Sequence, residues 1–270
     1  MDLKGPLGLV LTGGGALGAW EAGFLDGLLR GGLRFERVLG YSSGALAGAA
    51  HFLGAMPELL DRWHNVSDGR ILRFAPCYSP FSLFSGDPLH ESVQVAHDDE
   101  NAKRLAAFDF TVVTVNTELN RPAYHRFAPQ GAWDGPLAHR LIASSSIPVV
   151  FPPVEINGAI HIDGGIPTGE ALSFQALAGC GTVLIVEMVQ IEERGRKFWN
   201  PWIAFEQKGR EAALNQVEAG IASLKKLPSP PKILRLAPSK VLEFTMLDFK
   251  NACCVPAVDQ GLADAKLFLN

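Results

Sequence analysis

The sequence Gly-Tyr-Ser-Ser-Gly at residues 40–44 contains a serine whose setting favours nucleophilic chemistry. It fits the pattern Gly-x-Ser-x-Gly through Gly40, Ser42 and Gly44, and it lies between a short apolar strand pattern and a helical pattern. A tight strand-to-helix turn of this kind is the setting of a nucleophile elbow, in which the serine hydroxyl projects toward the substrate. Ser42 is therefore a candidate nucleophile, although an ordinary Gly-Ser turn that leads into a helix has the same composition.

A second set of backbone donors is expected where Gly13, Gly14 and Gly15 join an earlier strand pattern to a helical pattern. The N–H groups of successive glycines can form a concavity that binds a phosphate or a developing oxyanion, with the helix N-terminus behind it. Together with Gly18, these residues also fit the dinucleotide pattern Gly-x-Gly-x-x-Gly. A glycine-rich turn without a ligand is a further interpretation.

The neighbouring sequence argues against a nucleotide at this glycine loop. A dinucleotide site requires an acidic residue at the end of the second strand, about 20 residues further on. Here that strand pattern leads through Gly40 into Ser42, while Glu36 precedes it. No Gly-Lys-Ser or Gly-Lys-Thr sequence is present, which excludes a Walker A loop. An oxyanion hole is the competing role for these glycines.

Asp163 ends a further strand pattern and is followed by Gly164 and Gly165. Asp-Gly is most often simply a turn, but two glycines after the aspartate would let neighbouring backbone surround an accessible carboxylate. A serine needs a base to act as a nucleophile at neutral pH, and burial raises the pKa of a carboxylate that takes this role. The sequence therefore favours a dyad in which Asp163 accepts the proton of Ser42.

A triad of serine, histidine and acid is the alternative source of a base. In α/β-hydrolases the acid precedes the histidine along the chain, whereas all 7 histidines of this chain precede Asp163. Asp163 therefore cannot be the acid of a triad in that order. A triad built from another acid and from His139 or His161 stays open as an alternative.

Alternating strand and helix patterns must position these residues. Short apolar or β-branched runs predict strands, and apolar residues at helical spacing predict helices. Strands are expected at residues 7–11, 37–39, 109–116, 123–127, 183–189 and 233–236, with two more within 149–162 around a turn at Asn157-Gly158. Helices are expected at residues 16–30, 43–53, 57–65, 136–144, 169–178, 201–224 and 255–269. This alternation predicts an α/β fold with a mostly parallel sheet and helices on both faces.

The segment at residues 74–88 has a distinctive composition, with three prolines and several aromatic residues. Proline-rich segments of this kind are typical of loops, so a loop or lid over the site is expected here. Phe81, Leu83 and Phe84 are candidates for lipid entry. The competing interpretation is that this loop packs against the core.

The composition is that of a globular protein. Hydrophobic residues make up 47% and charged residues 19% of the 270 residues, which is too apolar for a disordered chain and long enough for a sizeable core. The proline-rich segment 227–232 is a connector, because the strand beyond it would have no other partners, so one domain is expected over residues 1–270. The formal net charge of −4 argues against nucleic acid as a partner and limits membrane contact to transient, apolar association.

The same sequence argues for a cytoplasmic protein, at most peripheral at a membrane. Its 4 cysteines show neither metal-ligand spacing nor a disulfide framework, so reduced thiols are expected. A signal peptide is not expected, because cleavage near Ala19 would remove the glycine loop. The stretch 38–55 contains polar residues and glycines and fits a buried strand-turn-helix better than a transmembrane segment. Trp199 and Trp202 favour the start of a helix over a membrane anchor.

The glycine loop, the Gly-x-Ser-x-Gly sequence and the Asp-Gly-Gly sequence, in this order, resemble the patatin-like phospholipase family. Residues 12–23 resemble the opening block of bacterial members, and residues 143–153 resemble the block that precedes their aspartate. The resemblance is detailed over residues 6–190. The chain departs from the family pattern at Leu17, where many relatives carry Arg or Lys, and at Gly169, where many carry Asn.

The resemblance implies a serine lipid acyl hydrolase on a three-layer α/β/α sandwich with a mainly parallel sheet. Ser42 would be the nucleophile and Asp163 the base, while the amides of residues 13–15 and of Ser43 would form the oxyanion hole. An acyl-enzyme would form and then be hydrolysed, and neither a metal nor another cofactor is implied.

The implied substrate is an acyl lipid or ester, which covers phospholipid, lysophospholipid, neutral lipid and small ester. A non-catalytic lipid- or acyl-binding module with the same fold is the alternative function. Loss of Ser42 or Asp163 would indicate such a module, and this chain retains both. A nucleotide-binding protein that uses the glycine loop is a third class, which the missing acidic residue opposes.

Overall fold

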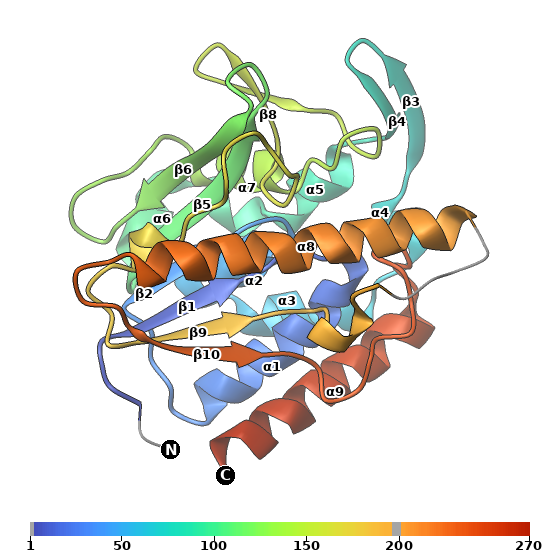
Figure 1. Cartoon of the computed structure of the whole chain (residues 1–270). Coiled ribbons are helices and arrows are strands. Elements are labelled where there is room, and N and C mark those ends of the chain that lie inside the picture. Colours follow the sequence, from blue (N-terminus) through green and yellow to red (C-terminus); the bar gives the residue numbers. More distant parts are fainter. Residues whose placement is uncertain (1–2, 196–200) are drawn as a thin grey trace.

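The computed structural model describes residues 3–195 and 201–270, with the backbone alone over residues 201–205. Within these residues, an eight-stranded sheet is covered by helices on both faces (Figure 1). The strands are β1 (Leu7–Leu11), β2 (Arg37–Gly40), β3 (Phe74–Tyr78), β4 (Phe81–Phe84), β5 (Asp109–Asn116), β6 (Arg121–Phe127), β7 (Val154–Ile156), β8 (Ala159–Asp163), β9 (Thr182–Val186) and β10 (Lys232–Leu236). The α-helices are α1 (Gly18–Arg30), α2 (Ser43–Phe52), α3 (Met56–His64), α4 (Asp68–Ile71), α5 (Asp87–Ser92), α6 (Asp99–Leu105), α7 (Leu137–Ser144), α8 (Pro201–Lys225) and α9 (Asn251–Leu269). The 3-10 helices are η1 (Gly15–Leu17), η2 (Gln94–Ala96), η3 (Gln175–Leu177) and η4 (Ile191–Glu193).

The central sheet is mixed but mostly parallel. Its strand order is β10-β9-β1-β2-β5-β8-β7, and β6 pairs along the other edge of β5. Neighbouring strands from β10 to β5 run parallel to one another. Strands β6, β8 and β7 join by antiparallel pairing. The expected α/β fold with helices on both faces and a mainly parallel sheet is confirmed.

Helices bury both faces of the parallel strands, which explains why these strands are continuous apolar runs. On one face, α8 contributes Val217, Ile221 and Leu224 to the core, and Figure 1 shows this helix lying across the sheet. On the other face, Trp20 of α1 and Phe52 of α2 are fully buried. Among the described residues, no helix combines the length and the apolar character that crossing a membrane requires.

Helices α1 and α9 approach each other closely through glycine. A Cβ atom at Gly23 of α1 would lie 2.1 Å from the carbonyl oxygen of Val258, and one at Gly261 of α9 would lie 2.2 Å from that of Trp20. The indole N–H of Trp20 donates a hydrogen bond to Oδ2 of Asp264 at 2.8 Å. The last helix is therefore fixed against the helix that follows the glycine loop.

Strands β2 and β8 share one edge of β5 and point toward each other along it. Parallel β2 ends with Gly40 opposite Val112. Antiparallel β8 ends with Asp163 opposite Thr114. Because the two partner positions on β5 are separated by one residue, the carboxyl ends of β2 and β8 meet. The chain enters Ser42 directly beyond β2, so the fold brings Ser42 next to Asp163.

The expectation of a loop over residues 74–88 is wrong. Strands β3 and β4 form an antiparallel hairpin in which Tyr78 pairs with Phe81, and α5 begins at Asp87. Proline is compatible with this arrangement, because Pro76 lies in the outer strand β3 and Pro80 lies in the turn. Figure 1 shows the hairpin extending away from the central sheet.

The expectation of a helix over residues 169–178 is also wrong, because this segment contains only the 3-10 helix η3. Leu172, Phe174 and Leu177 are buried in the core beneath α8. A Cβ atom at Gly220 of α8 would lie 2.3 Å from the ring of Phe174, so that ring packs directly on the helix backbone. Packing of these side chains overrides the helical spacing of the segment.

Most of the other expected elements are present with shifted ends. The first strand of the pair within residues 149–162 begins at Val154, directly after two prolines. The long helix α8 begins at Pro201, as expected. Trp199 and the side chain of Trp202 lie outside the described residues. Helices α4, α5 and α6 were not among the expected elements, because they are too short to show a clear period.

The close approach of α1 and α9 predicts that Gly261→Ala destabilises the protein. The new methyl group would lie 2.2 Å from the carbonyl oxygen of Trp20 and would force the helices apart. We expect the free energy of unfolding in urea to fall by about 1–3 kcal/mol. Gly69→Ala in α4 is the matched control, because no heavy atom lies within 4 Å of that Cβ position. Equal effects of the two substitutions would contradict this account of the helix packing.

Candidate active site

Ser42 lies at the turn between β2 and α2 in a backbone conformation that residues other than glycine rarely adopt, with φ 55° and ψ −135°. Its hydroxyl donates a hydrogen bond to Oδ2 of Asp163 at 2.7 Å. Both residues are buried, with exposed fractions of 5% for Ser42 and 3% for Asp163. The two residues that the sequence predicts as a dyad are in direct contact.

The backbone of Gly165 positions Asp163, and a side chain of α8 positions Gly165 in turn. Its Oδ1 atom accepts the N–H of Gly165 at 2.7 Å, and Gln216 of α8 donates to the carbonyl of Gly165 at 2.9 Å. Burial raises the pKa of Asp163 to about 6, although the hydrogen bonds from Ser42 and Gly165 act in the opposite direction. A carboxylate with this pKa is ionised at neutral pH, and it is a better base than an aspartate in water.

A run of serines at the end of α7 supports both members of the pair. The hydroxyl of Ser144 accepts the N–H of Ser42 at 3.0 Å and donates to the carbonyl of Val113 at 2.6 Å. The carbonyl of Ser146 accepts the N–H of Asp163 at 3.0 Å. Ser144 therefore connects the strained turn at Ser42 to β5.

The glycine loop lies against the serine turn. A Cβ atom at Gly13 would lie 2.7 Å from Cβ of Ser42, so only glycine permits this approach. Gly15 has a φ of 56°, in the left-handed region. The N–H of Gly14 donates to the hydroxyl of Ser43 at 3.2 Å. Within the described ranges, the N–H groups of Gly13, Gly15 and Ser43 donate no hydrogen bond, so three backbone donors around Ser42 are free.

The remaining motif glycines allow close backbone contacts at the two turns. A Cβ atom at Gly40 would lie 2.7 Å from the carbonyl oxygen of Gly44, and one at Gly44 would lie 2.3 Å from that of Thr12. A Cβ atom at Gly164 would lie 2.2 Å from the carbonyl oxygen of Val113. These glycines let the turns after β2 and β8 pack against neighbouring strands.

The glycine loop is anchored at both ends by groups far apart in the sequence. Glu21 accepts the N–H of Thr12 at 2.9 Å, before the loop. The carbonyl of Met246 accepts the N–H of Ala16 at 2.8 Å, after the loop. The same carbonyl oxygen would lie 2.2 Å from a Cβ atom at Gly15. The segment around Met246 therefore forms a wall behind the loop.

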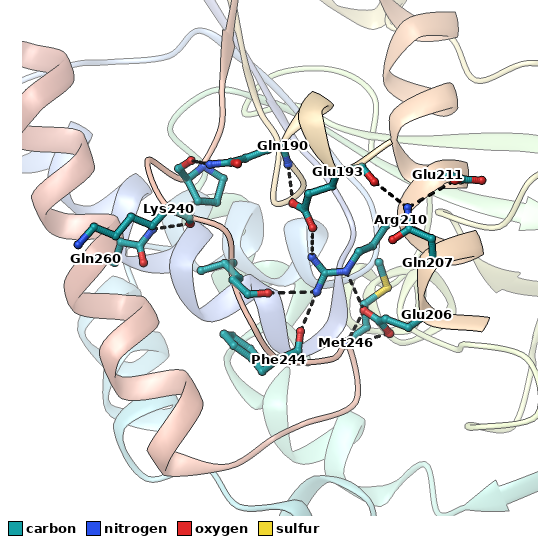
Figure 2. Close-up of polar contacts among 12 residues, drawn as sticks. Gln190, Glu193, Glu206, Gln207, Arg210, Glu211, Lys240, Phe244, Met246 and Gln260 are labelled. Atoms are coloured by element: carbon teal, nitrogen blue, oxygen red, sulfur yellow. Dashed lines mark hydrogen bonds and ion pairs between the residues drawn. The ribbon is translucent and has the colours of Figure 1, made fainter. Parts of the chain in front are cut away.

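A buried ionic network holds the segment around Met246 in place. Figure 2 shows Arg210 of α8 between two glutamates. Its Nη1 atom lies 2.6 Å from Oε2 of Glu193 and its Nε atom 3.2 Å from Oε1 of Glu206. Arg210 also donates to the carbonyl of Phe244 at 2.7 Å, and Glu206 accepts the N–H of Met246 at 3.1 Å. Burial raises the pKa of Glu206, and the charge of Arg210 opposes this shift.

A cavity of about 280 Å³ opens beside the serine turn, and its lining includes Gly15, Ser42 and Ser43. Its walls are mostly apolar and include Leu59, Trp63, Ile71, Leu89, Phe151 and Phe249. Charged residues of both signs, Asp61, Arg62, Arg70 and Glu91, also line it. The cavity is at the small end of ligand pockets, which enclose about 300–1,000 Å³. It is shaped for an apolar group whose polar end lies near Ser42.

The histidines of the alternative triad are engaged elsewhere. His161 and His125 each hydrogen-bond to the hydroxyl of Thr114 at 2.8 Å. His139 lies on α7, and burial lowers its pKa. In residues 3–195 and 201–270, no histidine hydrogen-bonds to Ser42 or Asp163. The arrangement provides a direct serine–carboxylate contact in place of a triad.

Several residues of the site escape prediction from sequence. Ser144 lies in the block that resembles the family, but nothing in the sequence shows which of its serines contacts Ser42. Met246, Arg210 and Gln216 come from the C-terminal third of the chain, and no motif indicates them.

The contacts of Ser144 predict that Ser144→Ala lowers stability by about 1–3 kcal/mol, because the N–H of Ser42 would be buried without an acceptor. Urea unfolding measures this loss. Ser146→Ala is the control, since the hydroxyl of Ser146, just beyond α7, donates only to the carbonyl of Ile142 in that helix, at 2.8 Å. A loss in Ser146→Ala as large as that in Ser144→Ala would contradict the assigned role of Ser144.

Comparison with known proteins identifies relatives of this chain. A protein named lysophospholipase nte1, from Aspergillus terreus, is 24% identical over 232 residues, which cover 80% of this chain and 15% of that protein. An uncharacterized NTE family protein of Mycobacterium bovis is 27% identical over 161 residues, covering 58% of this chain and 42% of that protein. The chain thus spans less than half the length of these curated relatives.

A solved structure shares the fold. The crystal structure of VipD from Legionella pneumophila matches with a TM-score of 0.55 and 15% sequence identity, covering 100% of this chain and 67% of that one. The family model described as patatin-like phospholipase matches residues 9–172, which include the glycine loop, the serine turn and the Asp-Gly-Gly turn. The chain therefore belongs to the patatin-like phospholipase family.

Proposed function

We propose that this protein is a serine lipid acyl hydrolase that cleaves fatty-acyl esters through an acyl-enzyme. The observation that carries the proposal is the 2.7 Å hydrogen bond from the hydroxyl of Ser42 to Asp163, at the edge of a cavity with apolar walls. Family membership supports the same reaction class.

In the first half of the reaction, Ser42 attacks the ester carbonyl while Asp163 accepts the proton of its hydroxyl. The ester bond then breaks, the alcohol takes that proton from Asp163, and the acyl group stays on Ser42. In the second half, water attacks the acyl-enzyme while Asp163 accepts a proton from it. The bond between the acyl group and Ser42 then breaks, the Ser42 oxygen takes that proton from Asp163, and the fatty acid leaves. Each half returns Asp163 to its ionised state.

The oxyanion of each tetrahedral intermediate is stabilised by backbone donors of the glycine loop. The free N–H groups of Gly13, Gly15 and Ser43 are the donors we assign to this role. Gly14 belongs to the same loop, but its N–H donates to the hydroxyl of Ser43 and thereby positions that residue. A donor of this type contributes about 10²–10³ in rate.

The cavity supports a substrate with one acyl chain. Its volume of about 280 Å³ and its apolar walls fit a single chain better than two. Two arginines and two carboxylates along the lining leave no net charge, which suits a neutral or zwitterionic head group. Lysophospholipids have this form, and the name of the Aspergillus relative is consistent with it.

A fluorophosphonate probe tests the reaction class directly. We expect a single adduct on Ser42 by mass spectrometry, and at least about 100-fold slower labelling in Asp163→Asn, because the general base is lost. Ser42→Ala is the control that should not label. Labelling that persists in Asp163→Asn would place the base elsewhere, with His139 and His161 as the next candidates. No labelling of the native protein, while a known esterase reacts, would favour the non-catalytic lipid-binding module.

The pKa of Asp163 predicts the pH dependence of turnover. The base acts when ionised, and burial raises its pKa to about 6, so kcat/KM for a soluble neutral ester should rise with pH through about 6 and then level off. Below this pH the rate should fall about tenfold per unit. Circular dichroism at each pH controls for unfolding. A rate that stays constant down to pH 4.5 would contradict Asp163 as the base.

A further inference from the structure

The β3–β4 hairpin exposes an unusual amount of aromatic surface. The exposed fractions are 71% for Phe74, 86% for Tyr78 and 50% for Phe81. Val149, which pairs with the hairpin through Ser82, is 51% exposed. We call these four residues the hairpin surface. Contiguous apolar patches are rare on soluble proteins and mark sites of contact with a partner or a membrane.

The hairpin surface carries no charge. Residues 74–86 contain no Asp, Glu, Lys or Arg. The nearest charged side chain before the hairpin, Arg73, lies 3.6 Å from Asp87 and 3.4 Å from Glu91, so the base of the hairpin offers no unpaired positive charge. A partner that covers this surface must therefore offer apolar contacts and need not offer charge.

The hairpin begins and ends at the walls of the cavity beside Ser42. Ile71 of α4, just before it, and Leu89 of α5, just after it, both line the cavity. The N–H groups of Leu83 and Phe84 donate to the carbonyls of Val149 and Val150 at 2.8 and 3.0 Å, and this segment leads into Phe151, another lining residue. The hairpin is thus joined at its base to three segments that line the cavity.

The three residues that the sequence offers as candidates for lipid entry have different surroundings. They are Phe81, Leu83 and Phe84. Among the described residues, none of the three lines the cavity. Phe84 packs against the core, whereas Phe81 faces solvent. The hairpin is therefore no plug for the cavity. It is attached to segments that line the cavity and exposes Phe74, Tyr78 and Phe81 to solvent.

We propose that the hairpin surface inserts into the lipid–water interface of a neutral membrane and brings the cavity entrance to the lipid. The inference rests on the proposed function, because it assumes an acyl lipid as substrate. Aromatic side chains with a polar tip, such as Tyr78, sit favourably at the depth of the head groups. Insertion of a few apolar side chains gives reversible binding, as is required of a protein with a net charge of −4 that is not attracted by anionic lipid.

Insertion is tested with a fluorophore on the hairpin itself. Cys77 lies in β3 and is exposed, whereas Cys180 and Cys254 are buried, so NBD attached to Cys77 in a Cys253→Ser, Ser42→Ala protein reports on the hairpin. We expect a blue shift and greater emission with phosphatidylcholine vesicles, together with quenching by spin-labelled lipid. Unchanged emission and no quenching would overturn the proposal.

An unlabelled measurement provides the second test. Ser42→Ala protein should sediment with phosphatidylcholine vesicles, and adding Phe74→Ser, Tyr78→Ser and Phe81→Ser should weaken this binding at least tenfold. Leu267→Ser is the matched control, because Leu267 is 70% exposed on α9 and its loss should leave binding unchanged. Binding should not increase with phosphatidylglycerol or decrease in high salt. Equal binding by the triple variant, or binding that requires anionic lipid, would overturn the proposal.

Two further results separate this proposal from its alternatives. If the protein self-associates in ultracentrifugation, the triple variant abolishes this and vesicles are not bound, then a second copy covers the surface and the proposal fails. If vesicles are bound as expected but the native protein neither reacts with the fluorophosphonate probe nor hydrolyses lysophospholipid presented with those vesicles, then the proposed function fails while the membrane surface stands. The use of Ser42→Ala protein for vesicle binding keeps the two questions apart.

Discussion

The meeting of β2 and β8 along one edge of β5 is the constraint on which the rest of the site depends. Gly40 pairs with Val112 and Asp163 with Thr114, so two strands that run in opposite directions end face to face. A shift of either strand by one residue would turn its side chains to the other face of the sheet and separate Ser42 from Asp163. The antiparallel strand in a mostly parallel sheet therefore has a positional role.

Placing Ser42 and Asp163 in contact costs conformational and desolvation free energy, which the surroundings offset. Ser42 adopts a strained backbone conformation, and Asp163 is buried away from water. Ser144 satisfies the N–H of Ser42, and Gly165 satisfies one oxygen of Asp163. The burial that makes the carboxylate costly also raises its pKa to about 6, whereas the hydrogen bonds from Ser42 and Gly165 that stabilise the ionised form act in the opposite direction.

The region between α2 and β5 supplies much of the cavity wall and all of the exposed hairpin. The helices α3, α4 and α5 supply much of the lining of the cavity, while the hairpin between α4 and α5 carries the exposed aromatic residues. The central sheet positions Ser42, which follows β2, and Asp163, which ends β8. The buried network around Arg210 supports the glycine loop from the opposite side, through Met246. Most of the cavity wall and the Ser42–Asp163 pair thus come from different layers of the same fold.

The sequence by itself determined the turns after β1, β2 and β8 and the mostly parallel character of the sheet. Local backbone conformation requires the glycines at the ends of β1, β2 and β8, and the chemistry of the motif indicates the serine and the aspartate. Continuous apolar runs indicate buried parallel strands. Only the tertiary structure decided which side chains meet. The contact of Ser144 with Ser42, the wall formed by Met246, the buried segment at residues 169–178 and the exposed hairpin at residues 74–86 all depend on packing between distant segments. Such packing leaves no period or motif in the local sequence, because the partner of each residue lies elsewhere in the chain.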